Sequence, residues 1–129
     1  METRVINPWT WQDRAGFSQA WQVQGVGSVV FVSGQAPIGA DGQLVGEGDF
    51  EAQVRQVFEN LKTVVGEAGL GLDAIVKLTV YLTEMARLGD YTRIKGEFFT
   101  GAHPASTAVG VTALARPEML VEVEAIAAS

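Results

Sequence analysis

Two acidic residues near the C-terminus are the side chains best suited to chemistry in this chain. Glu122 and Glu124 lie in an alternating run, and side chains two apart on a β-strand point to the same face. A carboxylate that is walled off from water can orient or deprotonate a water molecule for attack on an electrophilic carbon. The simpler interpretation is that both acids cover a solvated sheet face, and the pattern by itself allows either.

A row of very small side chains comes shortly before these acids. A strand over about residues 106–112 would place Ser106, Ala108 and Gly110 on one face. We expect this row to lie opposite the two acids and to leave space for a ligand between the strands.

Other chemistries find little support. The absence of cysteine excludes disulfides and cysteine nucleophiles. The single histidine, His103, lies three residues before Ser106, which is a poor placement for a Ser-His-Asp triad. The glycine-rich segment 34–48 lacks the Lys-Ser/Thr ending of a P-loop, so we interpret it as a surface or pocket-rim loop. The spacing of Asp, Glu and His predicts no metal site.

Size and composition indicate one soluble domain. The 129 residues fit a single domain over 1–129, and 47% hydrophobic residues can form a real core. A formal net charge of -6 disfavours binding to nucleic acid. No apolar run approaches the roughly 18–20 residues that span a bilayer, so we expect no membrane contact. The start, Met1–Arg4, lacks the layout of a signal peptide, and we predict a cytoplasmic protein.

Two amphipathic helices are predicted. After the candidate N-cap Asp49, apolar residues recur at spacings of three and four as far as Ala68, and Gly69 is a natural stop. A second, shorter stripe begins at Leu88 and ends before Thr100. The aromatic segment Asn7–Trp11 is expected to be held by packing, or to shape a pocket or a subunit contact.

Strands surround these helices. We predict strands at 3–6, 20–24, 28–33, 75–82, 106–112 and 120–126, in the order ββ(β)αβαββ. Gly25 and Gly27 indicate a hairpin between the second and third strands. This order predicts an α+β two-layer sandwich, with both helices on one face of one sheet. Tyr81, the Ser106 row and the apolar run near Val30 do not suit a solvated face, so we expect the sheet to pack against other copies.

Six motifs in a fixed order carry a family resemblance. They are VSGQAPI (32–38), AQVRQVFENLKTVVGEAGL (52–70), IVKLTVYLTEM (75–85), EFF (97–99), HPASTAVGV (103–111) and VEVEAIA (121–127). Together they resemble the Rid/YjgF family of reactive-intermediate deaminases over nearly the whole chain after about Ala15. The opening INPWTW departs from the common family start and indicates a divergent subgroup.

The resemblance implies both a fold and an activity. The fold is a chorismate-mutase-like α+β sandwich that forms a homotrimer around a central barrel, with clefts for a small-molecule ligand between subunits. The activity is hydrolysis of reactive enamines or imines to carbonyl compounds and ammonia, and it needs no cofactor.

The resemblance also implies a set of site residues. Glu122, in VEVEAIA, takes the position of the family's glutamate that helps to place the water. The implied substrate-binding positions are Phe17, Ser33, Thr92, Ser106, Thr107 and Ala108.

Several of these positions depart from the family pattern. Ser106 stands where the family has the arginine that pairs with a substrate carboxylate, and Ala108 stands at a position that is often cysteine. Phe17 lacks a tyrosine hydroxyl, and Thr92 replaces the usual asparagine. Losing a charged, partly buried partner costs a few kcal/mol, or a factor of about 10² or more in activity.

We therefore expect a roomier and less basic pocket, and a substrate other than the standard small 2-imino acids. Alternatively, another cation holds the carboxylate, with Arg14 and Arg116 as candidates. A rival hypothesis is a non-catalytic trimer that binds a small molecule or regulates another enzyme. A ribonuclease activity has also been attached to relatives, and the acidic composition disfavours it here.

Overall fold

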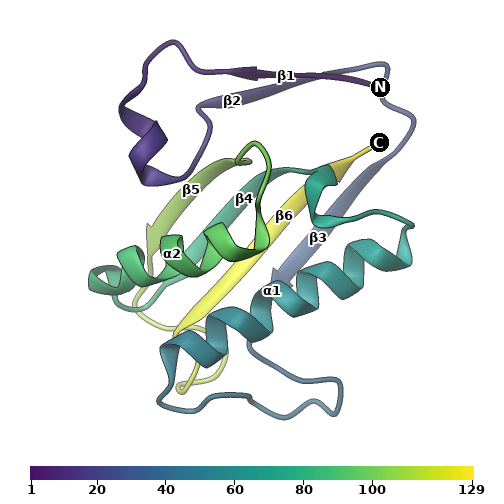
Figure 1. Cartoon of the computed structure of the whole chain (residues 1–129). Helices are drawn as coiled ribbons and strands as arrows, with labels where there is room; N and C mark the ends of the chain where they lie inside the picture. Colours follow the sequence, from purple (N-terminus) through teal and green to yellow (C-terminus); the bar gives the residue numbers. More distant parts are fainter.

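A four-stranded sheet with two α-helices on one face forms the body of the protein (Figure 1). The computed structural model describes all residues, 1–129. The strand order is β3-β6-β4-β5, and only β4 and β5 run parallel. The elements are β3 (Val29–Gln35), α1 (Phe50–Glu67), β4 (Ile75–Leu82), α2 (Leu88–Phe98), β5 (Ala105–Gly110) and β6 (Val121–Ala128). The predicted α+β two-layer sandwich with a mixed sheet is confirmed.

Helix α1 forms where the apolar stripe predicted it. The Asp49 side chain accepts a hydrogen bond from the backbone N–H of Ala52 at 3.0 Å, which caps the first turn. The chain leaves the helix through Gly69, whose φ of 76° suits glycine. Neither helix is long and apolar enough to cross a membrane.

The helices bury one face of the sheet and leave the other open. Along β4, Leu78, Val80 and Leu82 are fully buried under the helices, whereas Lys77 and Tyr81 point the other way. We call the face without helices the open face. Most of its side chains are at least partly accessible to solvent.

Two further strands leave this sheet. β1 (Glu2–Ile6) and β2 (Ala20–Gln24) pair only with each other and form a two-stranded ribbon that crosses over one end of the molecule (Figure 1). The predicted hairpin between residues 20–24 and 28–33 is therefore wrong. Gly25 does turn the chain, with φ of 63°, but the edge of β3 stays unpaired on that side.

Contacts with the start of β5 and the residues just before it hold the ribbon in place. The Ser18 hydroxyl and the Trp21 indole N–H both donate to the carbonyl oxygen of His103, at 2.6 and 2.8 Å. The backbone N–H of Ser18 donates to the carbonyl oxygen of Pro104, and Ser18 forms a parallel bridge with Ala105. The ribbon is thus anchored beside β5, on the opposite side of the sheet from β3.

Strand order also corrects the expected position of the two acids. β4 lies between β5 and β6, so the row Ser106, Ala108 and Gly110 does not face Glu122 and Glu124 across a shared space. The row aligns with the buried residues of β4, while the acids align with its open-face residues. The small side chains and the acids lie on opposite faces of the sheet.

Candidate functional site

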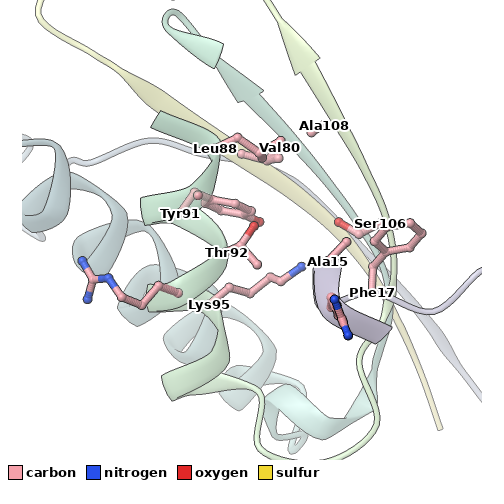
Figure 2. A pocket seen from close by; sticks show the side chains of 12 residues that line it. Ala15, Phe17, Val80, Leu88, Tyr91, Thr92, Lys95, Ser106 and Ala108 are labelled. Atoms are coloured by element: carbon pink, nitrogen blue, oxygen red, sulfur yellow. The ribbon is translucent and has the colours of Figure 1, made fainter. Parts of the chain in front are cut away.

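A cavity of about 640 Å³ lies between α2, β5 and the short 3₁₀ helix η1 (Trp11–Ala15) (Figure 2). This volume falls in the range of small-molecule sites in proteins. Four of the six predicted substrate-binding residues line it, namely Phe17, Thr92, Ser106 and Ala108. Residues far apart in the chain thus meet at one place on the helix-covered side of the sheet.

Local geometry at the end of η1 brings Phe17 to the cavity. Gly16 has φ of 71°, which turns the chain sharply after η1. A Cβ atom on Gly16 would lie 3.1 Å from the Thr92 methyl group, so the close approach of η1 to α2 favours glycine. The Phe17 ring then packs edge-on against Trp11, with centroids 5.7 Å apart.

The cavity is lined by basic residues and by no acidic residue. Arg14, Arg93 and Lys95 contribute to its wall. Arg93 also forms a 3.5 Å ion pair with Glu51, whereas Arg14 takes part in no ion pair within the chain. Concentrated positive charge in a chain of net charge -6 favours an anionic ligand.

The expectation of a pocket less basic than that of the archetypal family members stays a prediction. The position of the missing arginine, Ser106, carries no charge, yet three other cations line the same cavity. Of the two substitutes considered from the sequence, Arg14 lies there and Arg116 does not. Arg116 instead donates two 3.3 Å hydrogen bonds to the carbonyl oxygen of Gly42.

Lys95 is a buried residue of the cavity that neither the motifs nor the family resemblance indicated. It is the only charged residue among the buried side chains, with 2% of its surface exposed. Its amine lies 5.7 Å from the centre of the Tyr91 ring and makes no ion pair. Burial alone lowers the pKa of Lys95 to about 8. The spacing of Leu88, Tyr91 and Lys95, three and four residues apart, is the helical signal that would have placed it on the inner face.

Two other polar groups near Lys95 are buried without a hydrogen-bond partner. They are the Tyr91 hydroxyl and Nδ1 of His103. Burial raises the pKa of Tyr91, so its hydroxyl stays protonated and can donate. Burial, and secondarily the charge of Lys95, lowers the pKa of His103. Buried polar groups are nearly always hydrogen-bonded, and Tyr91 lines the cavity, so its hydroxyl is suited to a polar ligand.

Ser33 and Glu122 form a second group on the open face. The pairing of β3 with β6 shifts register between Val32 and Gln35, and Ser33 lies in this irregularity. The Glu122 side chain lies over Gly34, because a Cβ atom there would clash with the carboxylate. Glu122 makes no hydrogen bond within the chain. Its neighbour Glu124 accepts one from the Tyr81 hydroxyl at 3.1 Å.

Thr107, the remaining predicted residue, also lies on the open face. Its hydroxyl accepts a 2.7 Å hydrogen bond from the amine of Lys77. One chain therefore places Phe17, Thr92, Ser106 and Ala108 in the cavity, and places Ser33, Thr107 and Glu122 on the other side of the sheet.

The N-terminal aromatic segment is not part of the core. Trp9 and Trp11 are 58% and 63% exposed, and only Trp11 contacts the cavity wall, through Phe17. The expectation that packing holds this segment is met only at Trp11. No cluster of three or more His, Asp or Glu side chains is arranged to bind a metal ion.

Known proteins share this arrangement of elements. The family model described as Endoribonuclease L-PSP matches residues 11–129. Protein DfrA of Myxococcus xanthus is 42% identical over 116 residues, which are 88% of this chain and 85% of DfrA. The crystal structure of YyfB, a Rid-family protein of unknown function from Yersinia pestis, has 40% identity and a TM-score of 0.91 over 100% of both chains. RidA from the Antarctic bacterium Psychrobacter sp. PAMC 21119 has 34% identity and a TM-score of 0.75 over 88% of each chain.

Proposed function

Because the chain belongs to the Rid/YjgF family, whose family model carries the name Endoribonuclease L-PSP, we propose that it is a homotrimeric hydrolase of reactive enamines or imines. It would convert its substrate to a carbonyl compound and ammonia. The observation that carries the proposal is the cavity, which collects Phe17, Thr92, Ser106 and Ala108 and surrounds them with positive charge.

The cavity supports a substrate that is anionic and bulkier than the smallest 2-imino acids. Its volume of about 640 Å³ far exceeds the needs of a three-carbon acid. Serine at position 106 leaves open the space that a longer side chain would fill. The guanidinium group of Arg14 forms no ion pair with an acidic residue of the chain. A guanidinium group can bind a carboxylate in a bidentate manner.

A neighbouring copy is needed to complete this site. Glu122 and Ser33 lie on the open face, so they can approach the cavity only from another subunit. The open face also carries Phe31, which is 78% exposed in the single chain. A large exposed aromatic side chain on a sheet face is typical of a surface that other subunits cover.

In the proposed reaction, water adds to the carbon of the C=N bond while the Glu122 carboxylate accepts a proton from that water. Glu122 returns this proton to the nitrogen of the tetrahedral intermediate. A second proton passes from the hydroxyl group to the nitrogen, the C–N bond breaks to release ammonia, and the carbonyl product forms. Positive charge at Arg14 holds the anionic group of the substrate in place.

The test is imine hydrolysis by the purified protein. An amino-acid oxidase generates 2-imino acids from alanine and from leucine, and semicarbazide traps the imine that remains. We expect faster loss of imine with the wild type, more so for the leucine product. We expect Glu122→Gln to lose activity by a factor of about 10² or more. Glu124→Gln is the matched control on the same strand and face, and it should keep activity.

Equal activity in Glu122→Gln and the wild type would exclude the proposed role of this carboxylate. Ser106→Arg adds a further comparison. If only this variant hydrolyses the alanine product, the wild-type cavity does not hold a small carboxylate.

The missing arginine also favours a second candidate, a trimer that binds a small anionic molecule without turning it over. Ligand-induced stabilisation without product formation would support this candidate, because a ligand that binds only the native state raises its stability. RNA cleavage is the activity that the family model's name suggests. RNA cleavage could be assigned to this chain only if it disappeared when a cavity residue was substituted.

A further inference from the structure

Lys95 has an unusual position for a lysine. Its side chain leaves α2 and extends into the cavity toward Ala15 and Ser106 (Figure 2). It is buried, and no carboxylate of the chain pairs with it. The amine of a lysine on a surface helix normally reaches water, where its charge contributes to solubility. The buried amine of Lys95 does not have that role.

We propose that Lys95 is a nucleophilic amine that forms a covalent imine with the carbonyl carbon of the ligand. The proposal rests on the proposed function for its ligand class, a small carbonyl compound or the corresponding imine with an anionic group. No feature of the family resemblance assigned a role to this position.

The surroundings of Lys95 favour the neutral, nucleophilic amine. Apolar atoms of Phe17, Leu88 and the Tyr91 ring lie around the cavity, and Arg14 and Arg93 add positive charge to its wall. Burial disfavours the ammonium form, and lysines that form Schiff bases in apolar pockets are activated in this way. With a pKa of about 8, about a tenth of the side chains are neutral near pH 7.

The small side chains of β5 give the amine room to react. Ser106 lines the cavity on the side to which Lys95 extends, and Ala108 lies farther along β5, on the side of Val80 and Leu88 (Figure 2). A substrate carbon placed there lies between the amine and the edge strand. An anionic group on the same substrate then points to Arg14. A 2-oxo acid or 2-imino acid has both features.

The covalent step balances without a cofactor. The amine nitrogen of Lys95 attacks the carbon of the substrate imine and a C–N bond forms. Both protons of the amine pass to the substrate nitrogen, which leaves as ammonia when its bond to carbon breaks and the lysine imine forms. Water then adds to the carbon of the lysine imine, and the proton that it releases goes to the lysine nitrogen. The proton of the new hydroxyl group passes to the same nitrogen, and cleavage of that C–N bond yields the carbonyl compound and the free amine.

Reductive trapping tests the covalent step directly. The full-length protein is incubated with sodium cyanoborohydride and either pyruvate or propionaldehyde, and the adduct is located by intact mass and peptide mapping. The chain has only three lysines, Lys62, Lys77 and Lys95, so the assignment is simple. Lys62→Met is the matched control, because Lys62 lies exposed on α1.

We expect the wild type and Lys62→Met to carry one adduct at Lys95, formed at least ten times faster than any adduct at Lys62. Pyruvate should react faster than propionaldehyde if Arg14 holds its carboxylate. Lys95→Met and Lys95→Arg should lose this adduct. The first replaces the amine by an apolar group of similar length and the second keeps the charge.

Adducts at Lys95 no faster than those at Lys62 would overturn the proposal, because the amine would then have no special reactivity. This outcome is separable from failure of the proposed function. Imine hydrolysis without trapping at Lys95 would leave a hydrolase that works through Glu122 alone. Trapping at Lys95 without imine hydrolysis would leave a carbonyl-binding amine in a protein that is not a deaminase.

Discussion

The two side chains that carry the proposed chemistry differ in their surroundings. Lys95 is enclosed by the cavity wall, while Glu122 lies half-buried on the open face next to Gly34. Lys62 is the same residue type as Lys95 and lies exposed on α1. Residue type alone therefore does not decide reactivity here, because desolvation acts only on the lysine that packing encloses.

The burial of Lys95 predicts a particular dependence of stability on pH. Its pKa is about 8 in the folded chain and 10.5 ordinarily, so between these values the unfolded chain binds more protons. The free energy of unfolding must then rise with pH over that window. The full cost of burying the charge, about 3 kcal/mol, is present below about pH 8 and is lost by about pH 10.5.

The measurement compares Lys95→Met with the wild type by urea unfolding from about pH 7 to about pH 10.5, at one protein concentration. We expect the variant to be the more stable protein at the lower pH, and the difference to shrink as the pH rises. Tyr91, His103, Arg14 and Arg93 surround Lys95 in both proteins, so the difference isolates the lysine. A pH-independent difference would show that Lys95 is not desolvated as the structure has it.

At the scale of elements, the irregular pairing of β3 with β6 positions Glu122. Gly34 lies in this irregularity, and a Cβ atom there would lie 2.8 Å from the carboxyl carbon of Glu122. We predict that Gly34→Ala displaces the carboxylate and lowers imine hydrolysis about as much as Glu122→Gln does, by a factor of about 10². Stability should change by less than about 1 kcal/mol, because the flexible end of the glutamate can move.

Gly66→Ala is the control for this substitution. Gly66 lies in α1 with no other group within 4 Å of an added Cβ atom. Alanine there should leave activity unchanged and add about 0.5–1 kcal/mol of stability, since glycine disfavours helix. Full activity of Gly34→Ala would contradict the proposed position of Glu122.

The buried amide of Gln53 ties helix α1 to the loop before it and to the segment that leads into β6. The Gln53 side chain donates to the carbonyl oxygens of Gly46 and Glu118, and it accepts from the backbone N–H of Leu120 at 2.8 Å. Gln53→Leu should therefore leave three partly buried backbone groups unpaired and lower the free energy of unfolding by about 2–4 kcal/mol. Gln56→Leu removes only a hydrogen bond to Asn60 and should cost less than about 1 kcal/mol in urea unfolding. Equal costs would show that the three buried bonds do not hold α1 in place.

At the scale of the whole molecule, the two parts of the proposed site lie on opposite faces of the sheet. The cavity is under η1 and α2, and Glu122 is on the open face. The proposed trimer reconciles them, since the open face of one copy can approach the cavity of the next. Phe31, with 78% exposure, is the largest apolar side chain that such an assembly would cover.

Phe31→Glu should dissociate the trimer to single chains, because a buried carboxylate without a partner opposes association. Analytical ultracentrifugation measures the mass directly. Val64→Glu is the control, since Val64 is 38% exposed on α1 in the opposite layer. It should leave the mass of the assembly unchanged. A wild type that sediments as a single chain would refute the homotrimer.

The elements whose pattern is local could be predicted from the amino-acid sequence. Apolar residues at helical spacing, the Asp49 cap and the Gly69 stop specified α1, because side-chain direction along a helix depends only on its own backbone. Alternation likewise assigned the two faces of β4. The ordered motifs led to the family and its sandwich fold. The family resemblance also implied Phe17, Thr92, Ser106 and Ala108, which the structure brings together.

Which segments are neighbours could not be predicted from the sequence and required the folded structure. Strand pairing is non-local, so nothing near Ser106 or Glu122 in the chain shows that β4 separates them and places them on opposite faces. The same holds for β2, which pairs with β1 and not with β3. The burial of Lys95 also depends on η1, which lies next to α2 in the fold although it comes about eighty residues earlier in the chain. A charged residue on a helix has no local signal that a distant segment will cover it.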